Sequence, residues 1–111
     1  MPEFCLMLVD DSEEDQFLTR YMIKKQYPDA TLIQVYDGEE ALEALETLEK
    51  LPNLILLDIN MPRMSGHEFL AEFKKRYDTL IPVAMLTSSL NDQDRQRAAA
   101  FECVIHYFNK P

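Results

Sequence analysis

The chain has 111 residues, of which 47% are hydrophobic, and its 20 acidic and 11 basic side chains give a net charge of −9. This length indicates a single domain that can fold without a metal or disulfide staple, and the negative charge argues against direct binding of nucleic acid. No apolar stretch approaches the ~20 residues that cross a bilayer, and the first residues lack a signal-peptide pattern, so we expect a cytoplasmic protein. Cys5 and Cys103 stand in apolar runs without a metal or redox spacing, which favours reduced thiols.

Short apolar runs alternate along the chain with polar segments of helical periodicity. In chain order, the predicted strands are residues 4–9, 31–35, 54–57, 83–86 and 104–108. The predicted helices between them have apolar faces formed by Phe17, Leu18, Tyr21 and Met22, by Ala41, Leu42, Leu45 and Leu48, and by Phe69, Leu70 and Phe73. A weaker helical pattern covers residues 92–100, after a possible cap at Asn91. Strict alternation of strand and helix predicts an α/β domain with a doubly wound parallel sheet.

In open sheets of this type, functional groups gather at the carboxyl ends of the strands. The first predicted strand ends at Asp10 and Asp11, and the third ends at Asp58. The fourth ends at Thr87, and the fifth leads into Lys110. Taken singly, these residues could be a helix cap, a turn and a solvated charge. Together they predict one crevice with three carboxylates, a hydroxyl and an amine.

Clustered carboxylates repel one another unless a cation lies among them, and a hard divalent ion such as Mg²⁺ suits an all-oxygen site. Asp11 and Asp58 could bind the ion directly, while Asp10 holds a water molecule. A carboxylate beside such an ion can attack phosphorus and form an acyl phosphate. Lys110 and Thr87 would then neutralise and hold the transferred group.

Four segments carry a resemblance to a known family. They are Leu-Val-Asp-Asp-Ser at 8–12, Leu-Leu-Asp-Ile-Asn-Met-Pro at 56–62 followed by Gly66, Leu-Thr-Ser at 86–88, and Lys-Pro at 110–111. Together, and in this order over the whole chain, they resemble the receiver domains of two-component response regulators. The resemblance implies a flavodoxin-like, five-stranded parallel sheet with the strand order 2-1-3-4-5.

The resemblance also implies a role for each site residue. Asp58 is the phosphoacceptor, and Thr87 and Lys110 grip the phosphoryl oxygens. The metal ligands are Asp10, Asp11, Asp58 and the backbone carbonyl of Asn60. Tyr107 corresponds to the aromatic residue that turns inward when the threonine moves towards phosphate. His67 and His106 have no ligand-spaced partners, so we expect them at surface or strand positions rather than in the site.

Two other functions remain open. One is a Mg²⁺-dependent phosphatase with an aspartyl nucleophile, which Asn60 disfavours because that position then lacks an acid or base. The other is a receiver-like binding module that is never phosphorylated, which would require the loss of a site residue. For a receiver, the expected partners are a sensor histidine kinase or phosphotransfer domain and an unknown downstream protein.

A last expectation concerns a helix that family members carry after the Lys-Pro pair. Right-handed crossovers with the order 2-1-3-4-5 leave the first helix alone on one face of the sheet. That helix, about 10 Å wide, covers less than half of a sheet roughly 24 Å across. We therefore expect residues 1–111 to form one receiver domain without its C-terminal helix, with the bare apolar face covered by further chain or by a partner subunit in a homodimer.

Overall fold

The computed structural model describes residues 4–59, 61, 64–77, 81–87, 96–97 and 99–109. Its strands are β1 (Cys5–Val9), β2 (Thr31–Val35), β3 (Leu54–Asp58), β4 (Val83–Thr87) and β5 (Val104–Asn109). Its helices are α1 (Glu13–Gln26), α2 (Gly38–Thr47) and α3 (Gly66–Tyr77). In the described part of the chain, no helix has the length and apolarity needed to span a bilayer.

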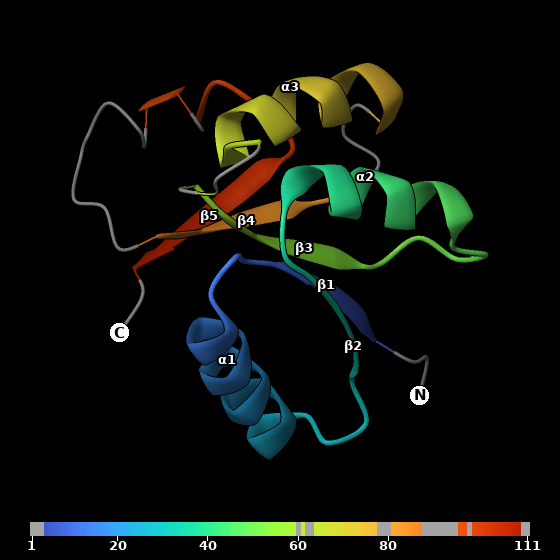
Figure 1. Ribbon diagram of the computed structural model, residues 1–111, viewed down its shortest axis with the longest axis vertical. Coiled ribbons are helices and arrows are strands. Elements are labelled where there is room, and N and C mark those ends of the chain that lie inside the picture. The colour runs from blue at the N-terminus through green and yellow to red at the C-terminus, as the bar shows by residue number, and fades with distance from the viewer. Residues whose placement is uncertain are drawn as a thin grey trace.

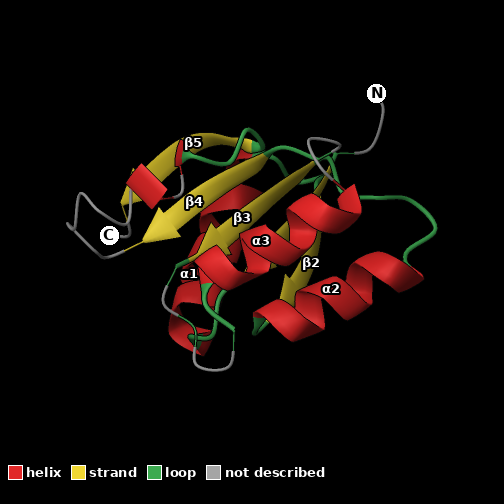
Figure 2. Ribbon diagram, turned by 90° about the horizontal axis from the view of Figure 1, so that it is seen from above, coloured by secondary structure: helices red, strands yellow, loops and turns green. Residues whose placement is uncertain are grey.

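The five strands are parallel and form one sheet in the order β2-β1-β3-β4-β5. Among the described helices, Figure 1 shows α1 on one face of this sheet and α2 and α3 side by side on the other. Figure 2, seen from above, shows α2 and α3 in front of the strands and α1 behind them. The predicted flavodoxin-like fold, its strand order and its division of helices between the two faces are confirmed.

The helices that follow β1 and β3 both begin at caps that the sequence encodes locally. The hydroxyl of Ser12 accepts a hydrogen bond from the backbone N–H of Asp15, over 3.2 Å, at the start of α1. Before α3, Ser65 and Glu68 form a reciprocal capping box with distances of 3.2 and 3.3 Å. Both caps follow directly on loops that leave the carboxyl end of a strand, so they help to fix the loops where the predicted site lies.

The larger core lies between the sheet and the pair α2 and α3. The predicted apolar faces of these helices supply buried residues to it, namely Ala41, Leu42, Leu45, Phe69, Leu70 and Phe73. Strand residues Met7, Val9, Ile55, Leu57, Val83 and Met85 pack against them. The acidic residues Glu39, Glu40, Glu43, Glu46 and Glu49 are all exposed. The helical periodicity of these two segments was therefore sufficient to predict both their buried and their solvated faces.

The first helix differs from its prediction. Its apolar residues Phe17, Leu18, Tyr21 and Met22 are exposed, with 48–66% of their surface accessible, while Gln16 is buried. The second, smaller core on this face consists of the strand residues Leu6, Leu8, Leu56, Ala84 and Leu86, with Ile23 of α1 packed against it. A shallow apolar groove therefore runs between α1 and the strands, lined in part by Leu18, Met22, Leu86 and Phe108. The expectation of a poorly covered face is consistent with this groove.

The fifth strand also departs from strict alternation. Val104 and Tyr107 both pack against the larger core, although a period of two would place them on opposite faces. The reason is an irregularity in the β4–β5 register, where Val83 pairs with Val104 but Ala84 pairs with His106, so that Ile105 is skipped. The ring centroids of His106 and Phe108 lie 4.3 Å apart.

Two smaller expectations have different outcomes. Most of residues 92–100 lies outside the described part of the chain, although Ala100 donates a helical hydrogen bond to Gln96 over 3.2 Å. His106 lies on a strand as expected, but His67 is buried in the first turn of α3 rather than on the surface. His67 follows Gly66, whose backbone lies against the end of β3.

Candidate functional site

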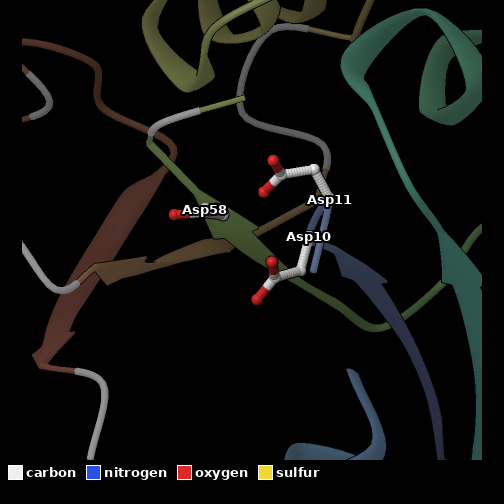
Figure 3. A group of neighbouring side chains, drawn as sticks. All are labelled: Asp10, Asp11 and Asp58. Carbon is white, nitrogen blue, oxygen red and sulfur yellow. The ribbon is translucent and has the colours of Figure 1, made fainter. Parts of the chain in front are cut away.

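Three carboxylates meet at the carboxyl ends of β1 and β3. One oxygen each from Asp10, Asp11 and Asp58 lies within 4.8 Å of the others. Figure 3 shows Asp10 and Asp11 on the loop that follows β1 and Asp58 at the end of β3. Asp10 and Asp58 are buried, whereas Asp11 is exposed. The site is thus open to solvent on the side of Asp11 and enclosed on the side of the sheet.

The pairing of the two central strands brings these residues together. β1 and β3 are neighbours, and Val9 pairs with Leu57, so the next residue on each strand is an aspartate. Asp10 donates its backbone N–H to the carbonyl of Val35, over 3.1 Å. Its Oδ1 accepts a hydrogen bond from the backbone N–H of Ser12, over 3.0 Å. The loop that carries the acidic pair is therefore tied both to β2 and to its own next turn.

The end of β3 is held by close contact with α3. The backbone N–H of Gly66 donates to the carbonyl of Ile59, over 2.8 Å. A Cβ at this glycine would lie 2.7 Å from the backbone oxygen of Asp58 and 2.8 Å from the Cα of Ile59. Only a residue without a side chain permits this approach of helix to strand. Gly66 formed part of the family resemblance, and this close approach explains why a glycine is needed at that position beside Asp58.

The structure describes only some of the remaining predicted site residues. Thr87 ends β4, the strand next to the one that carries Asp58, and it pairs with Asn109 at the end of β5, one strand further out. The carboxyl ends of β4 and β5 therefore lie at the same edge of the sheet as the three carboxylates. Tyr107 is half-buried on β5 and packs against the larger core. Asn60 and Lys110 lie outside the described residues, so their predicted roles stay predictions.

The donor set fits a hard divalent cation. All of its described members are carboxylate oxygens, which are the ligands that Mg²⁺ and Mn²⁺ take in proteins. Three such groups at this spacing repel one another, and a bound cation would remove that repulsion. The exposed side at Asp11 leaves room for the waters or phosphate oxygens that Mg²⁺ keeps as further ligands.

Gln16 is a residue near this site that sequence reasoning did not identify. Its side chain is buried, and its amide donates a hydrogen bond to the backbone carbonyl of Asp10. A single glutamine on an amphipathic helix gives no sign that it, rather than its apolar neighbours, faces the sheet. Only the spatial arrangement of α1 over β1 and β2 reveals it.

Comparison with known proteins identifies the class to which this fold and site belong. Residues 6–111 match the response regulator receiver domain, and the chain belongs to that family. It is a receiver domain of two-component signalling, and its homologues are signalling switches.

Among curated proteins, the chain is similar to the response regulator Rcp1 of Synechocystis sp., with 39% identity over 99 residues. That match covers 84% of this chain and 67% of Rcp1. The chain is also 32% identical over 111 residues to the sensor histidine kinase CheAY of Helicobacter pylori, and this second match covers 98% of the chain but 13% of CheAY. The chain therefore spans only part of these relatives.

Solved structures of response regulators have folds similar to that of this chain. The phosphorylated cyanobacterial phytochrome response regulator RcpA superposes with a TM-score of 0.88 at 30% identity, covering 98% of this chain and 81% of that one. The Mn²⁺-bound form of the response regulator Rcp1 gives a TM-score of 0.85 at 36% identity, covering 97% and 81%.

Proposed function

We propose that this receiver domain accepts a phosphoryl group on Asp58 from a sensor histidine kinase or a phosphotransfer domain. The observation that carries the proposal is the convergence of Asp10, Asp11 and Asp58, with Asp58 buried at the end of a central strand. The close approach of Gly66 to the backbone of Asp58 and Ile59 restricts the end of β3, and a nucleophile in a group-transfer site needs such a fixed backbone position.

The proposed metal is Mg²⁺, held by Asp11, Asp58 and the backbone carbonyl of Asn60, with Asp10 positioning a water ligand. When bound, the ion supplies positive charge that offsets the negative charge of the phosphoryl oxygens during transfer. The all-carboxylate donor set and its spacing support this assignment, and so does the Mn²⁺-bound form of a related receiver.

In the proposed reaction, a carboxylate oxygen of Asp58 attacks the phosphorus of the donor. A new bond joins that oxygen to phosphorus, the bond from phosphorus to the donor atom breaks, and its electron pair leaves with the donor. Lys110 and Thr87 hold the phosphoryl oxygens. Water later cleaves the acyl phosphate and restores the carboxylate, so the domain catalyses only its own phosphorylation and dephosphorylation and has no separate substrate.

The proposed output is a change of surface. The phosphoryl group adds about two negative charges and several hydrogen-bond acceptors beside the end of β4. Movement of Thr87 towards these oxygens would draw Tyr107 inward and alter the surface formed by β5 and the segment after β4. A downstream protein in the cytoplasm would recognise that surface. The negative net charge supports a protein partner over direct binding of nucleic acid.

Incubation with acetyl phosphate and Mg²⁺, followed by intact-protein mass spectrometry, tests the proposal. We expect one added phosphoryl group that hydroxylamine removes, and no addition to the Asp58→Asn variant. Rapid turnover of a phosphate ester by the wild-type protein would instead indicate a phosphatase. Absence of both activities in the folded protein would indicate a binding module that is never phosphorylated.

A further inference from the structure

The side chain of Gln16 contacts three backbone carbonyls around the acidic loop. Gln16 is 1% exposed and lies in the first turns of α1. Its Nε2 lies 2.8 Å from the oxygen of Val35, 3.0 Å from that of Asp10 and 3.3 Å from that of Leu8. An amide nitrogen carries two hydrogens. The two shorter contacts are therefore its main hydrogen bonds, and the Leu8 carbonyl shares one of the hydrogens.

The other end of this side chain is held from β2. Gln34 donates its Nε2 to the Oε1 of Gln16, over 3.0 Å. Three carbonyl acceptors on one side and a donor on the other leave a single orientation of the Gln16 amide that satisfies all partners. The amide thus joins α1, β1 and β2 at the point where β1 ends. Its removal would leave buried carbonyl oxygens without these hydrogen bonds.

This arrangement fixes the two residues on either side of Asp11. Asp10 is bound through its N–H to Val35, through its carbonyl to Gln16 and through its Oδ1 to Ser12. Ser12 accepts the backbone N–H of Gln16, over 2.9 Å, and caps α1 with its hydroxyl. Asp11 lies between these anchored neighbours, so its backbone position and the direction of its side chain depend on them.

We propose that Gln16, braced by Gln34, is a positioning residue that sets the spacing of the acidic cluster and thereby its affinity for a divalent ion. The inference depends on the proposed function, because it assumes that Asp10, Asp11 and Asp58 form an ion site. Gln16 itself touches no ion. It acts through the backbone of Asp10, as groups that orient metal ligands commonly do.

The test measures ion binding directly. The free Mn²⁺ ion is counted by electron paramagnetic resonance during titration of the wild-type protein and of Gln16→Met, which keeps the side-chain volume but removes the amide. Loss of a group that orients metal ligands typically weakens ion binding 10–100-fold, so we expect a dissociation constant raised about tenfold. The control is Leu45→Val, a buried change in the last turn of α2, towards the opposite end of the sheet. It should lower stability in urea without changing the Mn²⁺ affinity.

If Gln16→Met does not fold, Gln34→Met replaces it, because the half-buried Gln34 contributes only the brace. A weaker affinity for Mn²⁺ in the Gln34 variant than in Leu45→Val supports the inference. Equal affinities in the wild type and the folded glutamine variant would overturn it while leaving the proposed function intact. Failure of the wild-type protein itself to bind Mn²⁺ would instead overturn the ion site on which both depend.

Discussion

Replacing Gly66 with alanine tests whether contact between α3 and β3 holds Asp58 in place. The new Cβ would lie 2.7 Å from the backbone oxygen of Asp58 and 2.8 Å from the Cα of Ile59. Both are backbone atoms of the strand end, and neither can rotate away as a side chain could. The clash must therefore move α3 away from the sheet or move the end of β3 itself.

The expected cost follows from two opposing terms. Overpacking against a rigid neighbour costs about 1–3 kcal/mol. Alanine in place of glycine recovers at most about 1 kcal/mol in a helix interior and less at its first residue, where Gly66 stands. We expect Gly66→Ala to lower the free energy of unfolding by about 1–2 kcal/mol. We also expect phosphorylation by acetyl phosphate to slow, because the clash falls on the backbone of Asp58 and a shift of the end of β3 moves its carboxylate.

Gly38→Ala is the matched control. Its Cβ would meet the side chain of Met64, at 2.8 Å from the sulfur, rather than backbone. This half-buried, flexible side chain can change rotamer, so the cost should be smaller and Asp58 should not move. Urea denaturation and the rate of phosphorylation are measured for both variants. Wild-type stability and rate for Gly66→Ala, or a larger loss for Gly38→Ala, would refute the reasoning.

Three further predictions concern the ion, the switch and the exposed apolar face. Asp11→Ala should raise the Mg²⁺ concentration needed for phosphorylation at least tenfold and leave stability in urea nearly unchanged, because Asp11 is exposed; an unaltered Mg²⁺ titration would exclude it as a ligand. Lys110→Ala should still bind Mg²⁺ but lose the NMR shifts at Thr87 and Tyr107 on addition of beryllofluoride, and shifts like those of the wild type would remove the lysine from the coupling. The 111-residue chain should self-associate through the groove beside α1, as light scattering would detect, and Leu18→Glu should reduce this; a monomer at all concentrations would contradict the inference that this face needs a cover.

Much of the fold could be predicted because local sequence patterns coincide with tertiary burial. The apolar faces of α2 and α3 lie against the sheet, and their polar faces lie in solvent. The helical periodicity of the apolar residues alone therefore identifies Leu42 and Phe73 as core residues. The acidic cluster could be placed because Asp10 and Asp58 end apolar runs, and parallel strands bring such ends to one edge.

The errors arise where burial depends on partners that no local pattern encodes. Phe17 and Tyr21 suggested a core face for α1, yet the helix lies with Gln16 towards the sheet and leaves these apolar side chains exposed. A period of two placed Val104 and Tyr107 on opposite faces, and the irregular β4–β5 register brings them to the same core. Neither the bulge nor the buried amide has a signature in the sequence.

The site of phosphorylation is the central claim, and chemical mapping tests it most directly. The protein is treated with acetyl phosphate and Mg²⁺, the acyl phosphate is reduced with borohydride, and the digested peptides are sequenced by tandem mass spectrometry. Reduction converts a phosphorylated aspartate, and not a free one, to the corresponding alcohol. We expect this conversion at Asp58 alone, dependent on Mg²⁺. Conversion at Asp10 or Asp11 instead, or a stable phosphate on a serine or threonine, would contradict the assignment of Asp58 as the phosphoacceptor.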